Sequence, residues 1–388
     1  MKVDWLIVGA GFTGCTLAER IATQLNQKVL LIDRRNHVGG NAYDFYNNAG
    51  ILLHKYGPHI FHTNSKKVWD YLSAFTEWRP YHHHVLAVVD GRKVPVPFNL
   101  NTLEQLFPRK YAEKLETALL DAYGFNVKVP ILKMREHENP DLRVLANYIY
   151  KNIFENYTMK QWELKPEELD PSVTGRVPVY ISRDDRYFQD TYQAMPRYGY
   201  SVLFQKMLDH PNIRVLLNTD YRELEGMATF NRMIYTGAVD EYFDNMHGPL
   251  PYRSLRFEFV DVPEARVQES GTVNYPNDYD FTRITEQTYL SGQKLGVSTM
   301  VVEYPQRHVP GVTEAYYPIP REANKDHYNL YLKEVQKLNG SVVLAGRLAD
   351  YKYYNMDQAV AHALKVFEDQ IAQPVAPLAA SELLAASQ

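Results

Sequence analysis

The sequence has 388 residues and a formal net charge of −4, and its Lys and Arg residues form no stripe, which argues against a nucleic-acid partner. This length is enough for two or three domains with hydrophobic cores of their own. The single cysteine, Cys15, excludes an internal disulfide and is typical of a reducing compartment, and we expect it to be a small packing residue.

No apolar run reaches the roughly 18 residues that a bilayer-spanning helix needs, so we expect no membrane insertion. The first strand is predicted to begin at about Val3, which leaves no room for a leader peptide. Together these features predict a cytoplasmic protein. Its 30 tyrosines are unusual, and their flat rings and phenol donors suit a site for a nucleobase and a diphosphate.

The N-terminus shows the order of strand, glycine turn, helix, strand and acid that is typical of a dinucleotide-binding unit. An apolar strand over 5–8 leads into a G-x-G-x-x-G segment, a helix is predicted over 16–25, and a strand over 29–32 ends at Asp33. The glycines let a pyrophosphate approach the helix N-terminus, and the acid can bond a ribose hydroxyl. The predicted cofactor contacts in this unit are Gly9, Gly11, Phe12, Thr13, Gly14 and Asp33.

A second glycine pair, Gly39 and Gly40, lies within the segment 34–42. Such a pair lets another stretch of backbone approach an extended, buried FAD, and NAD-binding folds usually lack it. We therefore predict FAD rather than NAD, with an ordinary glycine turn as the alternative. Arg34, Gly39, Gly40 and Asn41 join the predicted cofactor contacts.

The next predicted elements change in character along the chain. Residues 1–80 alternate strand and helix, which implies a parallel sheet. Helical spacing prevails from 101 to about 171 and is clearest over 111–122 and 142–154, whereas the charged, proline-bounded stretch 165–171 is predicted to be a mobile loop. The other predicted elements are a hairpin over 85–96 that turns at Asp90-Gly91, a helix over 198–208, strands over 213–217 and 232–235, and short antiparallel segments over 252–304.

The C-terminal part returns to the pattern of the N-terminus. A strand over 342–345 is followed by Gly346-Arg347, a helix over 356–371 and a frayed tail after 373. A second helix N-terminus near the cofactor would stabilise negative charge there, and reduced flavin is an anion. This element at the far end of the chain predicts that the nucleotide-binding domain is discontinuous.

We therefore predict an α/β fold with a discontinuous Rossmann-like FAD-binding domain, a helical insertion and an antiparallel β-sheet substrate domain. The predicted boundaries are 1–80, 197–247 and 320–388 for the FAD-binding domain, 98–170 for the helical domain with a mobile lid around 162–176, and 81–97, 171–196 and 248–319 for the sheet domain.

Several rare strings between the two ends make the prediction more specific. They are Lys55-Tyr56-Gly57-Pro58-His59-Ile60-Phe61-His62-Thr63, Tyr157-Thr158-Met159-Lys160-Gln161-Trp162, Arg176-Val177-Pro178, Tyr252-Arg253-Ser254-Leu255-Arg256-Phe257-Glu258, Phe281-Thr282-Arg283-Ile284, Glu314-Ala315-Tyr316-Tyr317-Pro318 and the stretch 346–354. In this order they resemble the bacterial UDP-galactopyranose mutases, and the resemblance covers nearly the whole chain.

The resemblance implies an isomerase that interconverts UDP-galactopyranose and UDP-galactofuranose and feeds galactofuranose into cell-surface polysaccharide. In that family reduced FAD is a nucleophile: its N5 attacks the anomeric carbon, UDP leaves, and the ring contracts through a flavin–sugar iminium. The resemblance also implies a homodimer or a higher homo-oligomer.

The resemblance carries over site residues by role. Arg176 and Arg283 would hold the leaving diphosphate and, with His62, form the catalytic set. The implied substrate contacts are Phe154, Tyr157, Trp162, Tyr187, Asn274, Tyr317 and Tyr353. The further implied cofactor contacts are His59, His62, Gly237, Gly346, Arg347, Tyr354 and Met356.

Two positions depart from the family pattern: Asn355 replaces an acid and Ile153 replaces an aromatic residue. Two other functions stay open, namely a flavin oxidoreductase that transfers hydride and a nucleotide-sugar binding protein without catalysis. The discriminating feature is the set of arginines and tyrosines, which a diphosphate needs and an amine or apolar substrate does not. Neither the His59/His62 pair nor the His82/His84 pair has an evident third ligand, so no metal site is predicted.

Overall fold

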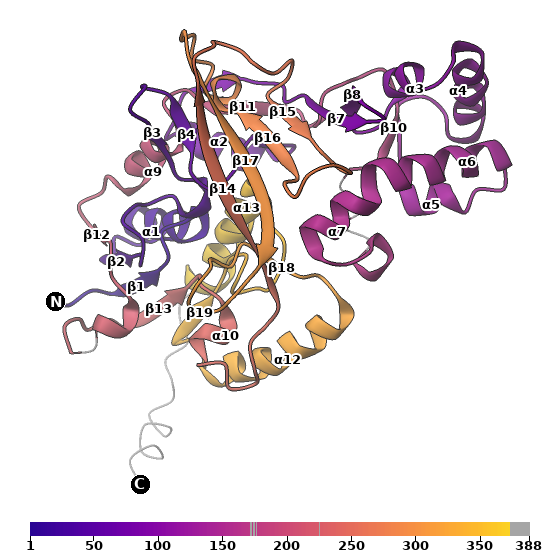
Figure 1. Ribbon diagram of the computed structural model, residues 1–388. Coiled ribbons are helices and arrows are strands. Elements are labelled where there is room, and N and C mark those ends of the chain that lie inside the picture. Colours follow the sequence, from indigo (N-terminus) through magenta and orange to yellow (C-terminus); the bar gives the residue numbers. More distant parts are fainter. Residues whose placement is uncertain (171–172, 174, 176, 225, 373–388) are drawn as a thin grey trace.

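The structure is a computed structural model that describes residues 1–388 except 171–172, 174, 176, 225 and 373–388 (Figure 1). Strands from both ends and the middle of the chain form a parallel sheet with the order β12-β2-β1-β13-β19. Its strands are β1 (Trp5–Val8), β2 (Val29–Ile32), β12 (Ile213–Leu216), β13 (Arg232–Tyr235) and β19 (Val342–Leu344). The predicted α/β class is confirmed, and β13 has the bounds that the sequence predicts.

Both faces of this sheet are covered, because alternate side chains of each strand point to opposite sides. Ile7 and Leu31 pack against one layer of helices. Leu6 and Leu30 pack on the other face near Leu224. The helices of the first layer are α1 (Phe12–Gln24), α9 (Tyr200–Leu208) and α13 (Met356–Val366), which continues as the π-helical η5 (Phe367–Ile371), and the second face carries η4 (Tyr221–Leu224) and α10 (Val239–Tyr242).

Two helix starts differ from the prediction. Helix α1 begins at Phe12 rather than residue 16, because extended Gly11 turns directly into the helix without a side-chain cap. Helix α9 begins two residues later than predicted, because Gly199 has a φ of +88° that ends the preceding turn. The earlier start of α1 places its first peptide N–H groups beside the glycine turn.

Residues 33–80 do not continue the predicted alternation of strand and helix. Apart from α2 (Lys66–Ser73) and the 3-10 turn η1 (Gly40–Ala42), they form short antiparallel strands. The strands are β3 (Asp44–Tyr46), which pairs with β4 (Leu52–His54), and β5 (Phe61–Thr63) and β6 (Trp78–Pro80), which both pair with β11 (Tyr192–Pro196). Three-residue strands are too short for their alternation to be read from sequence.

A second large sheet has the order β18-β14-β17-β16-β15-β7-β8, and its long strands β14 and β17 run through the centre of Figure 1. The hairpin of β7 and β8 turns at Asp90 and Gly91 with positive φ, as predicted. The expected antiparallel pairing holds except between β15 and β7, which are parallel. The bounds are β7 (Val85–Val89), β8 (Arg92–Val96), β14 (Tyr252–Val262), β15 (Thr272–Asn274), β16 (Arg283–Glu286), β17 (Ser298–Arg307) and β18 (Tyr317–Pro318), with α11 (Gln287–Ser291) between β16 and β17.

The helical insertion projects to the right in Figure 1 and has its own core of buried Leu, Ile and Val side chains. The short strands β9 (Val127–Val129) and β10 (Val179–Ile181) pair beside it, and the sequence did not predict them. The elements of the insertion are α3 (Leu100–Leu106), α4 (Arg109–Tyr123), α5 (Ile131–Arg135), α6 (Pro140–Ile149), the π-helical η2 (Tyr150–Glu155), α7 (Asn156–Trp162) and the 3-10 turn η3 (Pro166–Glu168). Helix α12 (Glu322–Lys337) lies at the bottom of the view.

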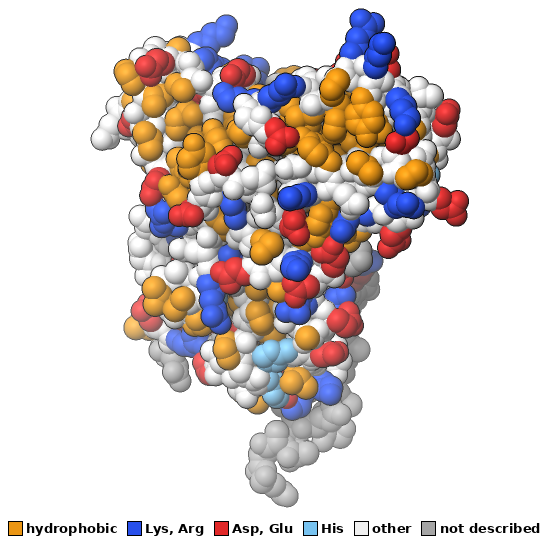
Figure 2. All heavy atoms as spheres, turned by 45° about the vertical axis from the view of Figure 1, so that its right-hand side comes forward, with side chains coloured by type: hydrophobic (Ala, Val, Ile, Leu, Met, Phe, Trp, Pro, Cys, Tyr) orange, Lys and Arg blue, Asp and Glu red, His pale blue; other side chains and the backbone are white. Residues whose placement is uncertain are grey.

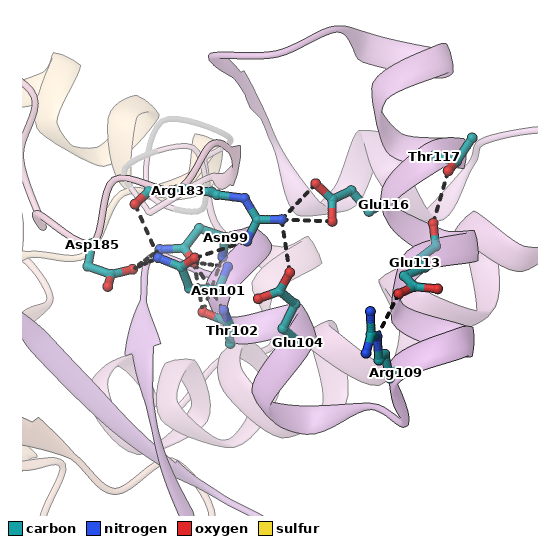
Figure 3. Close-up of polar contacts among 10 residues, drawn as sticks. All are labelled: Asn99, Asn101, Thr102, Glu104, Arg109, Glu113, Glu116, Thr117, Arg183 and Asp185. Atoms are coloured by element: carbon teal, nitrogen blue, oxygen red, sulfur yellow. Dashed lines mark hydrogen bonds and ion pairs between the residues drawn. The ribbon is translucent and has the colours of Figure 1, made fainter.

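Polar contacts join this insertion to the chain that follows β10 (Figure 3). Asn99 caps α3 by accepting hydrogen bonds from the N–H groups of Asn101 and Thr102. The Arg183 guanidinium lies 2.9 Å from carboxylate oxygens of both Glu104 on α3 and Glu116 on α4. One side chain thus fixes the mutual position of two helices and the strand end.

Among the described residues, no helix is long and apolar enough to cross a membrane. On the face drawn in Figure 2, hydrophobic side chains gather in the upper part, and Lys and Arg side chains intermingle with Asp and Glu side chains elsewhere.

Candidate active site

The two glycine clusters of the sequence touch each other at the carboxyl end of β1. The Gly39 N–H donates to the Ala10 carbonyl at 2.7 Å. A Cβ on Gly40 would lie 2.9 Å from the Gly11 Cα, and a Cβ on Gly14 would lie 1.9 Å from the Gly9 carbonyl oxygen. A side chain at Gly40 would separate the two clusters, and one at Gly14 would push α1 away from the turn at Gly9, so glycine is required at both positions.

A cavity of about 240 Å³ lies over these clusters and the N-terminus of α1. Most of the predicted cofactor residues line it, namely Gly9, Gly11, Phe12, Thr13, Asp33, Arg34, Gly39, Gly40, Asn41, His59, Gly237, Gly346, Arg347 and Met356. The N-terminal residues of α1 and of α13 both lie in its wall, so two positive helix ends face the same space. Such a wall suits a ligand that carries phosphate or other negative charge.

The acid Asp33 orders this wall as well as lining it. Its Oδ2 accepts from the Ala10 N–H at 2.8 Å and its Oδ1 from the Arg35 N–H at 2.9 Å. Beside it, Arg34 and Arg35 both donate to Glu314 Oε2 at 2.9 Å. Burial would raise the pKa of Glu314, but the two guanidinium groups outweigh it and hold that pKa below its usual range.

A larger cavity of about 490 Å³ lies between the helical insertion, the second large sheet (called the mixed sheet below) and the segment that leads from β19 into α13. Every residue that the resemblance assigns to substrate lines it: Phe154, Tyr157, Trp162, Tyr187, Asn274, Tyr317 and Tyr353. The two cavities share His59, Arg347 and Met356 in their walls. They therefore meet at these residues, and one ligand can lie across the junction.

Neighbouring strands of the mixed sheet place a row of side chains along one wall of the larger cavity. Ala87 of β7 pairs with Asn274 of β15, Asn274 pairs with Arg283 of β16, and Arg283 pairs with Glu303 of β17. Paired positions share a face of the sheet, and all four residues line the cavity. The register thus brings an amide, a cation and a carboxylate into line.

Arg283 and Glu303 form a buried ion pair in this row. The Nη2 and Nε groups of Arg283 donate to Glu303 Oε2 at 2.7 and 3.0 Å, and Glu303 is only 2% exposed. Burial disfavours the charge of Arg283, but the Glu303 carboxylate outweighs it and keeps the pKa of Arg283 above its ordinary value. Because Glu303 occupies one side of the guanidinium, a ligand anion would meet the other side.

Two aromatic rings lie beside a second cation in the cavity wall. The rings of Tyr317 and Tyr353 stack with centroids 5.3 Å apart, and the Arg347 guanidinium carbon lies 5.4 and 5.3 Å from the two centroids. Arg347 also donates to the Tyr354 carbonyl at 2.6 Å. Burial raises the pKa of Tyr317, so its phenol stays a neutral donor.

Helix α7 carries two of the aromatic residues into the cavity and is anchored at its end. The buried Arg253 of β14 donates to the Gln161 carbonyl at 2.8 Å and pairs with Glu163 at 2.7 Å. These contacts satisfy the carboxyl end of the helix that positions Tyr157 and Trp162. Burial raises the pKa of Tyr157, which therefore stays protonated.

The two histidines of the segment 55–63 lie in different settings. Burial lowers the pKa of His59 to about 3, so its imidazole is neutral. Its Nδ1 lies 2.9 Å from the Gly57 carbonyl, which can only accept, so Nδ1 carries the proton. His62 stacks on Phe188 with ring centroids 3.6 Å apart, and its Nδ1 lies 2.9 Å from Asp190 Oδ2.

Several predicted site residues lie elsewhere. Gly14 lines neither cavity and serves the close contact of α1 with Gly9. Tyr354 lines neither cavity, because its ring packs beside His362 and only its carbonyl reaches Arg347. Arg176 lies outside the described residues. The two departures from the family pattern, Ile153 and Asn355, both line the larger cavity.

Sequence reasoning missed Glu303, Asp190, Phe188 and His83, which all line the larger cavity. Glu303 could have been suspected, because it is a charged residue inside an apolar β-strand pattern. His83 is buried, while its neighbours His82 and His84 are exposed. Among the described residues, no group of three His, Cys, Asp or Glu side chains is placed to hold a metal ion.

Comparisons with known proteins agree with this geometry. The UDP-galactopyranose mutase family matches residues 152–353, and the NAD(P)-binding Rossmann-like domain matches residues 7–75. The chain is 33% identical to a probable UDP-galactopyranose mutase of Klebsiella pneumoniae, with 94% of each protein covered. It is 32% identical to the dTDP-fucopyranose mutase of Escherichia coli, with 93% of this chain and 96% of that protein covered.

A solved structure of reduced UDP-galactopyranose mutase shares the fold, with a TM-score of 0.65, 15% identity and 96% of each chain covered. A putrescine oxidase variant also shares the fold, with a TM-score of 0.61 and 12% identity. The sequence identities of 32–33% over nearly the full length place the chain with the mutases rather than with the oxidases. The chain therefore belongs to the UDP-galactopyranose mutase family and is a flavin-dependent isomerase.

Proposed function

We propose that this enzyme interconverts UDP-galactopyranose and UDP-galactofuranose with bound, reduced FAD. The observation that carries the proposal is the junction of the two cavities at His59, Arg347 and Met356. A cofactor in the glycine-lined cavity would present its reactive end there to a nucleotide sugar in the larger one. The names of the relatives from Klebsiella and Mycoplasma support this substrate.

The glycine-lined cavity fits FAD on chemical grounds. The contacts between the glycine clusters leave backbone N–H groups and the α1 N-terminus for the pyrophosphate. Asp33, which lines the same cavity, would accept a ribose hydroxyl. Neutral His59 and the N-terminus of α13 with Met356 would lie beside the isoalloxazine ring. When bound and reduced, the flavin supplies a nucleophilic N5 for the anomeric carbon.

The protein's own part in the reaction is to hold the leaving UDP. We propose that Arg283 and the phenols of Tyr317 and Tyr353 bind the diphosphate and stabilise the charge that develops on it. Glu303 would fix the direction of the Arg283 guanidinium. Held in the cavity, UDP stays positioned to return to the sugar after ring contraction.

The uracil would lie at the end of the cavity that the helical insertion forms. Tyr157 and Phe154 would stack on the base, and Asn274 would bond its polar edge. Ile153, which also lines the cavity, would offer the base an aliphatic contact. Trp162 stands near Tyr317, with ring centroids 6.1 Å apart, at the start of the proposed lid 162–176. Arg176 would reach the diphosphate when that lid closes.

A second candidate substrate is dTDP-fucopyranose, because the fucopyranose mutase relative is nearly as similar as the galactopyranose mutase relatives. A hydride-transferring oxidase is less consistent with the cavity. Arg283, Arg347 and neutral phenols suit a diphosphate, whereas an amine cation would be repelled there. We further propose that the enzyme acts in the cytoplasm as a homo-oligomer and supplies galactofuranose for cell-surface polysaccharide.

The experiment is an assay of the purified flavoprotein with UDP-galactofuranose and, separately, dTDP-fucofuranose, with the flavin oxidised or reduced by dithionite. We expect conversion of UDP-galactofuranose only with reduced flavin, and none after reconstitution with 5-deaza-FAD. Activity with oxidised flavin or with 5-deaza-FAD would overturn the nucleophile mechanism. A much higher kcat/KM for the dTDP sugar would instead reassign the substrate.

A further inference from the structure

We propose that Asp190 is a positioning residue that sets the tautomer of His62, and that His62 carries a proton between two sugar hydroxyl oxygens during ring contraction. The proton-carrying part rests on the proposed function. The positioning part rests only on side chains in the cavity wall.

The geometry around His62 fixes the ring in one orientation. Its Nδ1 lies 2.9 Å from Asp190 Oδ2, and one face of the ring stacks on Phe188 with an interplanar angle of 14°. His62 is 14% exposed and lines the larger cavity. Because a carboxylate can only accept, Nδ1 carries a proton, and Nε2 is the nitrogen left for a ligand in the cavity.

Asp190 is itself held in place by a residue that follows the neighbouring strand β5. Asn64 Nδ2 donates to Asp190 Oδ1 at 2.8 Å. The orientation of the Asn64 amide is itself fixed, since its Oδ1 accepts from the Thr191 N–H at 2.9 Å and from the Thr191 hydroxyl at 3.1 Å. Asp190 therefore faces a donor on each side, Asn64 on one and His62 on the other.

The charges near His62 come from several elements. Asp190 accepts a hydrogen bond from His62, and this bond lowers the pKa of Asp190 more than burial raises it. The carboxylate therefore stays ionised. Lys128 of β9 also favours the charge of Asp190. His83, before β7, lines the same cavity as His62, but burial lowers its pKa to about 3, so it is neutral there. Asp190 is thus the charge in direct contact with the His62 ring.

Ring contraction moves a proton from one sugar oxygen to another. The C1–O5 bond of the pyranose breaks and its electron pair goes to O5, which takes up a proton. A lone pair of O4 forms the C1–O4 bond of the furanose, and O4 loses its proton. Nε2 of the neutral imidazole can take the proton from O4 and then give it to O5, while Asp190 stabilises the imidazolium that forms in between, so the atoms balance without another reactant.

The network predicts an unusual effect of Asp190→Asn. Asn64 Nδ2 and the fixed Thr191 contacts would keep the new amide oxygen toward Asn64. The new amide NH2 would then face His62 Nδ1 and force it to accept, so the proton would move to Nε2. His62 would no longer accept a proton from the sugar at Nε2.

The test measures the tautomer directly and the activity separately. In protein labelled with ¹⁵N-histidine, we expect the His62 signals to change from the Nδ1–H to the Nε2–H pattern in Asp190→Asn. In the double variant Asn64→Asp/Asp190→Asn, the new carboxylate at 64 would accept from the amide NH2 of residue 190. The amide oxygen of residue 190 would then face His62, which should restore the wild-type pattern. The matched control is Asp184→Asn, an ion-paired carboxylate on the same loop that does not line the cavity. An unchanged His62 pattern in Asp190→Asn would overturn the positioning role.

For activity, we expect Asp190→Asn to lower kcat about 10²-fold with little change in KM. Asp190→Asn should have no further effect in a His62→Gln background, because it acts through His62. Full additivity of the two changes would overturn this link, and near-wild-type kcat in His62→Gln would overturn the proton carrier. Absence of turnover in the wild-type enzyme with reduced flavin would count against the proposed function, while the tautomer measurement would still decide the role of Asp190.

Discussion

Arg283 on β16 and Glu303 on β17 are direct cross-strand partners, and both lie in the wall of the larger cavity. The Nη2 group of Arg283 and the Oε2 atom of Glu303 are 2.7 Å apart in a nearly buried setting. The same guanidinium therefore has two anionic partners: Glu303 in the free protein and, as proposed above, the diphosphate of the bound substrate.

This pairing predicts that Glu303→Gln destabilises the protein unless a ligand anion is present. The change leaves the Arg283 guanidinium, whose side chain is 26% exposed, without its carboxylate, at an expected cost of about 3 kcal/mol, the low end for a buried pair. UDP would supply replacement negative charge, so its addition should raise Tm by more in the variant than in the wild type. Thermal unfolding with and without UDP measures both effects.

The matched control is Glu258→Gln, which removes the partner of Arg256 from an exposed ion pair on β14 of the same sheet. Exposed pairs contribute little, so Tm and its response to UDP should stay close to wild type. An equal response to UDP in Glu303→Gln and the wild type would contradict the proposed meeting of Arg283 and the diphosphate.

Removal of either proposed diphosphate cation should abolish most turnover but not flavin binding. We expect Arg283→Ala and Arg176→Ala each to lower kcat/KM by about 10²–10³-fold, because each removes a charge from the leaving group. The flavin absorbance of the purified variants should match that of the wild type. A variant of either arginine with near-wild-type turnover would remove that residue from the catalytic set.

The contact between α1 and the glycine turn predicts that Gly14→Ala loses flavin. The added methyl group would lie 1.9 Å from the Gly9 carbonyl oxygen, so the turn would have to move away from α1. The flavin-to-protein ratio after purification measures the effect. Gly296→Ala is the control, since its Cβ would meet no atom within 4 Å, and it should keep the wild-type ratio.

The buried His83 and the partly buried His59 predict a loss of stability in mild acid. Burial lowers the pKa of His59 and of His83 to about 3 each, so both stay neutral in the folded state but become charged in the unfolded state below pH 6.5. The unfolded state then binds more protons, and the free energy of unfolding should fall as pH drops from 6.5 toward 3. Each histidine contributes a slope of about 1.4 kcal/mol per pH unit.

Urea unfolding between pH 7 and pH 4 would measure this slope. The His83→Gln variant should show a shallower decline than the wild type, whereas the exposed neighbour His82→Gln should not change it. An identical decline in all three proteins would mean that His83 is not neutral in the folded state.

Local patterns in the sequence were sufficient for the parts of the fold that short-range physics determines. The glycine spacing after β1, the hairpin turn at Asp90 and Gly91 and the helix that begins at Met356 depend on backbone conformations set by a few adjacent residues. The family resemblance then identified residues that line the larger cavity, because matching short strings to a family needs no knowledge of which strands pair.

The pairing of distant segments was decided by the tertiary structure alone. Glu303 became a candidate only through its register with Arg283, and Asp190 only through its contact with His62, 128 residues away in sequence. The parallel pairing of β7 with β15 brings Ala87 beside Asn274 in the same way. Such pairings arise from burial of side chains that are far apart in the chain, whereas turn and helix signals act over a few residues. The sequence by itself therefore determined the type of site, and the tertiary structure decided which side chains lie together in it.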